Sequence, residues 1–364
     1  MKLTAVLPNN ILKTCLLFLP LVIGSLHLNA QQIKGRIIDA KNGQPIAGAH
    51  VFINNTLSTT LSLNDGSFSL PLAGIGTIIV ACKGYHTFKE KTNSSINHTL
   101  EIQLQKKETE KVSVYVGPPS TLSLWQSQFK LNFLGRTQAA YQCSILNMQD
   151  VYFFKNHTDS NLIEARSEAP LIIFNKWLGY KITFFLERYW YQKNTRAASY
   201  FGYVYFESIK ENKKILKNRR NSYYGSAHHF YRTLVEGTLS KKEFSIKHIQ
   251  TDSSNKINNG YASLTTGMNA EDIFFKSPAT NLSYITWKQQ LQVTYLKAPK
   301  IYLSNHAMSL SIPHTTQSVL TKDAAQIWLD DSGTVLNPTN LYTDGYWSIY
   351  KLANHLPYHY TPDK

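Results

Sequence analysis

The sequence predicts a mostly β protein with some α: a small N-terminal antiparallel β-sandwich followed by a larger, strand-rich α+β domain. Apolar and polar side chains alternate over residues 49–53 and again over 100–104, which is the two-residue period of a half-buried strand. Between such stretches lie Asn42-Gly43 and Asp65-Gly66, which supply the positive φ that tight hairpin turns require. Beyond residue 122, runs of aromatic and β-branched residues continue the strand-rich character.

Residues 1–30 have the composition of a cleavable signal peptide. Lys2 and Lys13 are present without any acidic residue, and an apolar run from Cys15 to Leu26 is too short to span a bilayer. The segment ends at Ala30, a small residue suited to cleavage. We therefore expect export, with a periplasmic or outer-membrane-associated address, and a retained anchor is the alternative.

The chain of 364 residues is long enough for two domains after this signal peptide. We place the sandwich at residues 31–106, a linker at 107–121 and the α+β domain at 122–364. The linker region is rich in charge, contains a short β-prone piece at Val112–Val116 and ends in Pro118-Pro119. Consecutive prolines favour a stiff, extended spacer.

Two cysteines, Cys82 and Cys143, remain after the expected cleavage. Export permits a disulfide, but the two residues fall in different predicted domains. The sequence leaves two alternatives, a disulfide between Cys82 and Cys143 or two free thiols.

The sandwich region resembles a known family. The residues that carry the resemblance are Gly35, Asp39, Pro45-Ile46, Gly48-Ala49, Val51, Ile53, Asn64-Asp65-Gly66, Phe68, Leu70 and Gly84-Tyr85. This string is similar to the carboxypeptidase regulatory-like domain. The resemblance implies a seven-stranded, transthyretin-like sandwich that lacks peptidase chemistry and acts as an accessory module. It also implies a protein of the gram-negative cell envelope, where this module often precedes outer-membrane receptors.

In the second domain, segments rich in β-branched and aromatic residues are expected to form strands. They are residues 151–154, 171–174, 180–186, 200–206, 284–287, 291–296, 301–303 and 325–329.

One segment, from Asn218 to Leu234, has a helical period instead. Its apolar face consists of Tyr223, Ala227, Phe230 and Leu234, and its polar face of Ser226, His229, Arg232 and Glu236. We expect one amphipathic helix, capped by Ser222 or Ser226 and ended by Gly237. This segment also resembles a second domain of secreted proteins that carry the same sandwich, together with Leu178-Gly179-Tyr180, Gly345-Tyr346-Trp347, Leu356-Pro357 and Tyr360. That resemblance implies no reaction.

The candidate binding residues lie in and just before this helix. They are Arg219, Arg220, Tyr224, His229 and Arg232. Guanidinium groups pair with anions and aromatic faces stack on ligands, so these residues predict recognition rather than catalysis. The basic stretch Lys210–Arg220 and a formal net charge of +15 favour anionic partners. A plain solvated loop is the alternative for that stretch.

Export makes nucleic acid an unexpected partner. The expected partners are an anionic glycan, lipopolysaccharide, a peptide or another envelope protein, with peripheral membrane association as a further option. The sequence thus predicts an envelope accessory or binding protein.

A hydrolase built on Ser226 with His228 or His229 is one alternative. The segment lacks a Gly-x-Ser-x-Gly elbow, and Ser226 is equally suited to capping the helix, so no catalytic residue is predicted. A small outer-membrane β-barrel is another alternative, because aromatic strands with alternating polarity also build barrels. The segment 171–174 is apolar on both faces, which favours the α+β interpretation.

No metal or cofactor is expected. On a helix the adjacent His228 and His229 diverge by roughly 100°, so they cannot share one ion. His355 and His359 have the i, i+4 spacing of helical ligands, but Pro357 between them disfavours that helix.

Overall fold

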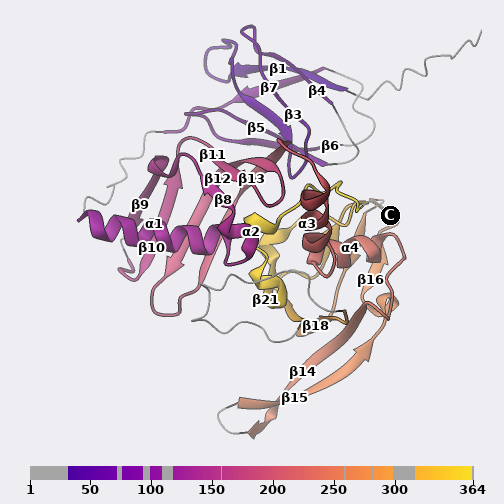
Figure 1. The fold of residues 1–364 in the computed structure, drawn as a ribbon. Coiled ribbons are helices and arrows are strands. Elements are labelled where there is room, and N and C mark those ends of the chain that lie inside the picture. Colours follow the sequence, from indigo (N-terminus) through magenta and orange to yellow (C-terminus); the bar gives the residue numbers. More distant parts are fainter. Residues whose placement is uncertain are drawn as a thin grey trace, which may run out of the picture.

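The computed structural model (Figure 1) describes residues 32–71, 76–92, 99–108, 118–156, 158–257, 260–280, 282–297 and 316–362, with the backbone alone for 251–263. The predicted signal peptide, the β-prone piece Val112–Val116 and the strand expected at 301–303 lie outside these residues. Among the described helices, none combines the length and the apolar character needed to cross a membrane.

The N-terminal part is a two-layer sandwich of seven strands. One sheet has the order β4 (Ser67–Pro71), β1 (Gln32–Asp39), β7 (Leu100–Leu104), and the other β3 (Thr59–Leu61), β2 (His50–Ile53), β5 (Gly76–Ala81), β6 (Phe88–Thr92). Alternate apolar side chains of both sheets form its core. The pairing is antiparallel except between β1 and β7, which run in the same direction.

Helix α1 (Pro119–Leu134) begins inside the segment predicted as a linker. Pro119 occupies the first helical position, where proline is favoured because its missing N–H has no helical acceptor. Trp125, Phe129 and Phe133 are buried at the spacing i, i+4, i+8. The prolines therefore start a packed helix, and the extended-spacer prediction is wrong from residue 119 onward.

Helix α1 covers a six-stranded sheet (Figure 1). The sheet runs β8 (Cys143–Ile145), β11 (Leu171–Asn175), β12 (Tyr180–Gln192), β10 (Leu162–Ser167), β9 (Val151–Lys155), with β13 (Ala198–Ser208) on the free side of β12. The ring of Phe129 lies 4.8 Å from that of Tyr189, and that of Phe133 lies 4.9 Å from that of Phe184. The short helix α2 (Gln138–Tyr141) follows α1.

The segment that was predicted to form a single amphipathic helix contains two helices, α3 (Lys213–Tyr223) and α4 (Ala227–Val235). Gly225 separates them with a φ of 82°, a left-handed conformation that stops the helix. Ser226 caps α4 by accepting the N–H of His229, as predicted, and Gly237 follows the end of α4 with a φ of 68°.

Helix α4 packs on a second core formed by two more sheets. The larger sheet runs β15 (Gly260–Met268), β14 (Phe244–Ile257), β18 (Gln290–Tyr295), β19 (Gln317–Lys322), β21 (Leu341–Gly345), and the smaller β16 (Phe274–Lys276), β17 (Ser283–Ile285), β20 (Ile327–Leu329). Short 3₁₀ turns lie at Met148–Asp150, Ala270–Asp272, Pro338–Asn340, Tyr346–Ile349 and Leu352–Asn354.

The sandwich is docked on strand β13 through an aromatic cluster. Phe52 and Ile79 on its outer face are fully buried against Tyr203 and Tyr205. The Phe52 ring lies 5.1 Å from that of Phe185 and 5.0 Å from that of Tyr205. Aromatic pairs at such distances add to the stabilisation from buried area, so the two parts form a packed interface.

Hydrogen bonds extend this interface along the edge of β13. Asn55 donates its N–H to the Val204 carbonyl at 2.7 Å, and the Asn54 side chain accepts the Val204 N–H at 2.9 Å. Phe206 donates its N–H to the Thr56 carbonyl at 2.9 Å. The turn after β2 thus pairs with β13 as a short additional strand.

Candidate binding site

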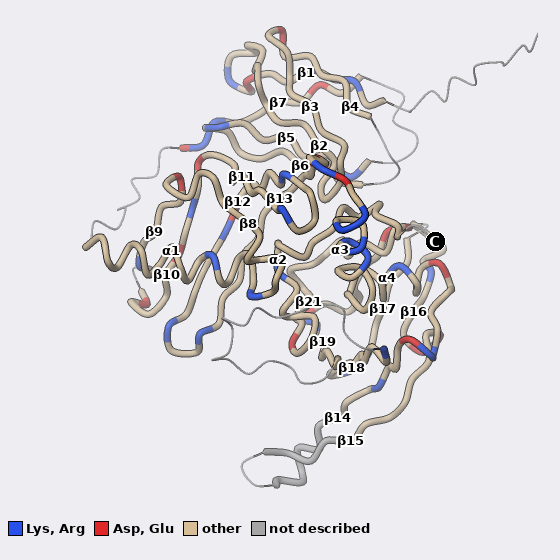
Figure 2. Tube along the Cα trace, viewed as in Figure 1, with Lys and Arg blue, Asp and Glu red and all other residues tan. Residues whose placement is uncertain are grey.

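The basic stretch that was expected to be a loop or a binding surface forms helix α3. Figure 2 shows Lys and Arg gathered along this helix. Lys213, Lys214, Lys217 and Arg220 are exposed, whereas Ile215 faces inward and is buried. The positive charge therefore lies on the solvent side of an amphipathic helix.

Arg219 differs from these neighbours because it is buried. Its Nε donates to the Leu178 carbonyl and its Nη1 to Glu211 Oε2, both at 2.8 Å. The guanidinium lies 4.0 Å from the centre of the Tyr180 ring, and burial raises the pKa of that phenol to about 12. Arg219 thus fixes α3 to the start of β12, and its donors are occupied inside the protein.

Arg232 and His228 hold the C-terminal segment against α4. Arg232 is 5% exposed and donates to the carbonyls of Tyr358 and Tyr360. His228 Nε2 lies 3.0 Å from the same Tyr358 carbonyl. The segment continues to the sandwich, where the Tyr358 N–H donates to the Asn55 carbonyl at 2.8 Å. Residues 355–360 therefore form a strap between α4 and the sandwich.

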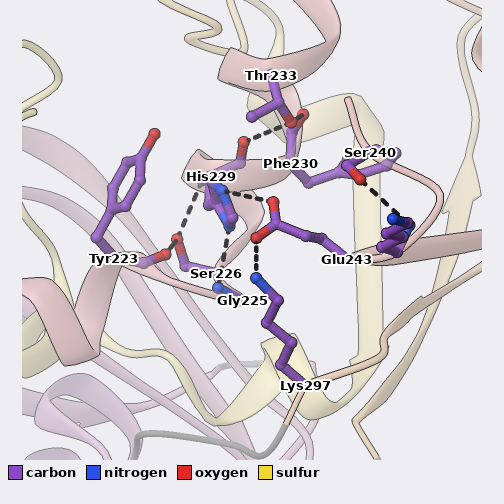
Figure 3. Close-up of polar contacts among 10 residues, drawn as sticks. Tyr223, Gly225, Ser226, His229, Phe230, Thr233, Ser240, Glu243 and Lys297 are labelled. Carbon is purple, nitrogen blue, oxygen red and sulfur yellow. Dashed lines mark hydrogen bonds and ion pairs between the residues drawn. The ribbon is translucent and has the colours of Figure 1, made fainter. Parts of the chain in front are cut away.

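His229 is buried beside Glu243 (Figure 3). Its Nδ1 accepts the Gly225 N–H at 3.2 Å, and its Nε2 lies 3.8 Å from Glu243 Oε2. Glu243 also pairs with Lys297. Burial lowers the pKa of His229 to about 4, so the imidazole is neutral at neutral pH with its proton on Nε2.

Ser226 is not placed to act as a nucleophile with this histidine. Its hydroxyl donates to the Tyr223 carbonyl at 2.6 Å and accepts the backbone N–H of His229 at 3.2 Å (Figure 3). A carboxylate does approach His229, but Nδ1 is occupied by Gly225 and Nε2 faces Glu243, so neither nitrogen can take a proton from Ser226. The hydrolase alternative therefore lacks its geometric basis.

The five predicted binding residues thus do not converge on one surface. Arg219, His229 and Arg232 have internal partners and little exposure, whereas Arg220 is exposed and Tyr224 is half-buried. A ligand contact by Arg220 or Tyr224 stays a prediction.

A cavity of about 760 Å³ lies where the sandwich, β13 and the strap meet. We call it the junction cavity. Its walls are residues 53–56, 76–77 and 89–91 of the sandwich, Phe184 of β12, residues 200–204 of β13, residues 330, 332 and 334–339, and His355, Tyr358 and His359 of the strap. Ligand pockets for small molecules typically have volumes of this order, roughly 300–1,000 Å³.

The two strap histidines, His355 and His359, line the cavity and have exposed side chains. Burial, with a smaller effect from Lys351, lowers the pKa of His355 to about 4, and burial also lowers the pKa of His359 despite the nearby Asp330. Both are therefore neutral at neutral pH and offer one donor and one acceptor each.

Sequence reasoning missed the junction cavity. Its walls come from segments that are more than a hundred residues apart in the chain, and no local pattern links them. The one available signal was the pair His355 and His359, which was considered only as a metal site. Within the described residues, no group of three or more His, Cys, Asp or Glu side chains could hold a metal ion. Cys82 and Cys143 are free thiols.

The family comparison matches residues 33–116 to the CarboxypepD_reg-like domain. The sandwich is a CarboxypepD_reg-like domain. This finding confirms the resemblance drawn from the sequence, and the match ends before the larger C-terminal part. Comparison with curated proteins finds no match to the chain.

Parts of the chain match solved structures, of which three are given. A candidate carbohydrate-binding protein from Bacteroides uniformis is 11% identical, with 65% of this chain and 98% of that chain covered and a TM-score of 0.18. A DUF3823 family protein from the same organism is 7% identical, with 83% and 99% covered and a TM-score of 0.17. A 9R-lipoxygenase from Cyanothece is 10% identical, with 58% and 49% covered and a TM-score of 0.18.

Replacing Arg232 with Lys should release the strap. A lysine ammonium cannot span two carbonyls as a guanidinium does, and hydrogen bonds to charged groups contribute about 1.5–3 kcal/mol. We expect faster amide hydrogen exchange at Tyr358 and Tyr360, measured by NMR. The exposed Arg220→Lys is the matched control, and equal exchange rates in the two variants would show that Arg232 does not hold the strap.

The buried histidines should make stability depend on pH. Burial lowers the pKa of His228 to about 3 and that of His229 to about 4, whereas the unfolded chain binds these protons near 6.5. The unfolded state therefore gains protons, and is favoured, as pH falls from 6.5 to 4. The free energy of unfolding should fall by up to about 1.4 kcal/mol per pH unit for each histidine.

Urea unfolding at several pH values between 7.5 and 4.5 measures this slope. His228→Gln, which keeps a donor near Tyr358, should make it shallower. His86→Gln, at an exposed histidine of the sandwich, is the control. A slope that His228→Gln does not change would contradict the assigned neutral state.

Proposed function

We propose that this protein is an exported, non-catalytic binding protein of the cell envelope that holds its ligand in the junction cavity. The observation that carries the proposal is the cavity itself. It is assembled from three parts of the chain, and its position between a regulatory-like module and a larger domain is where binding sites commonly form.

The chemistry of the walls supports binding. The aromatic residues Tyr200, Phe201 and Tyr358 line the cavity together with Asn54 and Asn55. Pockets of this mixture use apolar surface for affinity and a few polar groups for orientation. The neutral His355 and His359 add further donors and acceptors at the strap.

Asp330 and Ser332 of the cavity wall are hydrogen-bonded to each other and to their own turn. Asp330 is buried, and its Oδ1 accepts the N–H groups of Ser332 and Thr334 at 2.9 Å. The Ser332 hydroxyl donates to the same oxygen at 2.7 Å. Asp330 and Ser332 therefore stabilise the turn in which they lie.

Export and the charge of the chain support the envelope address. The N-terminal 30 residues have the composition of a signal peptide, and the formal net charge is +15. A basic exported protein meets anionic lipopolysaccharide and acidic polysaccharides, with which it associates loosely. The exposed basic side of α3 is the surface on which such peripheral association would occur.

Filling the junction cavity should abolish ligand binding. Thr77 lines the cavity from β5, so Thr77→Trp places a large ring there. The probes are an array of envelope oligosaccharides and a synthetic peptide library. We expect the dissociation constant of whichever probe binds to rise at least tenfold.

Ser69→Trp is the matched control, since Ser69 is exposed on β4 of the opposite sheet. Both variants should keep the thermal unfolding temperature of the parent within a few degrees. Undiminished binding by Thr77→Trp would place the ligand elsewhere, for instance at the exposed face of α3.

A further inference from the structure

Along strand β13, the backbone N–H and C=O groups of successive residues point alternately toward β12 and away from it. Val204 and Phe206 direct their backbone groups away from β12, because they bond the 54–56 turn of the sandwich. Every residue of β13 has a partner on β12. The bulge in this pair inserts its extra residue into β12, between Leu186 and Arg188, so the alternation along β13 is not interrupted. Successive residues of a strand point their N–H and C=O groups to opposite sides.

Tyr200 and Gly202 therefore present their N–H and C=O groups on the same edge as Val204. Both residues line the junction cavity. Among the described residues, the sandwich pairs with this edge only from Val204 onward. The edge of β13 is thus paired at one end and open to the cavity at the other.

We propose that the junction cavity binds an extended peptide, which adds a strand to the open edge of β13 at Tyr200 and Gly202. The proposal rests on the proposed function and names its ligand class. The sandwich already uses this edge, so an added strand would continue an existing interface. Strand addition gains affinity from main-chain hydrogen bonds and specificity from alternate side chains.

The side-chain preference follows from the sandwich wall. Ile79 on β5 faces the interface with β13, and the β5–β6 register places Lys89 beside Ile79 and Lys91 beside Thr77. Alternation along β6 therefore places the side chains of these two lysines on the face of the sheet that carries Ile79, and the side chain of Glu90, which also lines the cavity, on the opposite face. Every second side chain of the peptide would face the lysines, so we infer an acidic residue at alternate positions.

A glycan is less well matched to the open edge of β13 than a peptide is. Sugar hydroxyls do not repeat with the spacing of a strand edge, whereas a peptide backbone presents a donor and an acceptor at every second residue, toward one side. The open edge therefore distinguishes a peptide ligand from the other envelope partners.

The free protein provides the first measurement. In amide hydrogen exchange by NMR, Tyr200 and Gly202 should exchange at least tenfold faster than Val204, whose N–H is bonded to Asn54. Phe201 and Tyr203 should also be slow, because they point toward β12. Slow exchange at Tyr200 and Gly202 in the free protein would mean that the edge is already paired, and would overturn the proposal.

The second measurement adds a probe, an N-acetylated, C-amidated heptapeptide in which Glu and Val alternate. We expect it to slow exchange at Tyr200 and Gly202 at least tenfold. A Lys/Val heptapeptide of the same length is the charge control and should not protect them. Lys89→Gln with Lys91→Gln should weaken binding of the Glu/Val peptide at least tenfold, whereas Lys34→Gln, on the opposite sheet, should not.

N-methylation of the peptide tests strand pairing itself. A single N-methyl group is placed at each residue of the peptide in turn. It should abolish binding at every second position, where the N–H faces β13, and be tolerated at the positions between. Uniform tolerance, or uniform loss, would overturn the proposal.

The failures of the two proposals are distinguishable. If an oligosaccharide binds, is blocked by Thr77→Trp and leaves Tyr200 and Gly202 unprotected, the proposed function stands and the peptide inference is wrong. If neither probe binds in a manner sensitive to Thr77→Trp, both are wrong.

Discussion

The structure depends on the backbone of one residue, Asn55, which joins three distant parts of the chain. Its N–H donates to Val204 of β13 at 2.7 Å, and its carbonyl accepts the N–H of Tyr358 at 2.8 Å. Asn55 itself lies in the turn that follows β2 and has a φ of 60°. Asparagine adopts this left-handed conformation more readily than most residues, so the turn can pair with β13 on one side and with the strap on the other.

The remaining features follow from this junction. The Phe52 cluster presses the sandwich onto β13, and Arg232 with His228 draws the strap toward α4. Because the three parts meet at one residue and diverge from it, a space is left between them, which is the junction cavity. The polar side chains of α4 thus lie at a distance from the junction cavity. They hold one of its walls in place and do not contact it.

Local sequence patterns predicted a large part of the fold. Period-two alternation and Asn-Gly or Asp-Gly turns identified the sandwich, and β-branched runs located β9, β11 and β13. Helix α1 was missed although Trp125, Phe129 and Phe133 have helical spacing, because the preceding prolines were interpreted as a spacer. The break between α3 and α4 was missed because the apolar period continues through Gly225, which has a left-handed φ and no room for a Cβ beside the Tyr295 ring.

The candidate site was harder to predict, for a physical reason. Arg219 and Arg232 carry charge in the sequence, but their burial and their carbonyl partners depend on segments more than thirty residues away. The cavity depends on Asn55, Gly202 and Tyr358 lying together, and long-range proximity of this kind leaves no periodic signal. Sequence reasoning thus found chemically capable residues and assigned them to recognition, whereas the structure uses three of them for support.

The most direct test of this account is the thermal unfolding of two variants at Asn55 by calorimetry. Asn55→Gly keeps the left-handed φ without strain, whereas Asn55→Val forces a β-branched residue into it, at a cost of at least about 1–2 kcal/mol. The account predicts one cooperative transition for the parent and for Asn55→Gly. For Asn55→Val it predicts a lower-temperature transition of the sandwich, separate from that of the C-terminal part. One transition at the parent temperature in both variants would contradict the central role given to this junction.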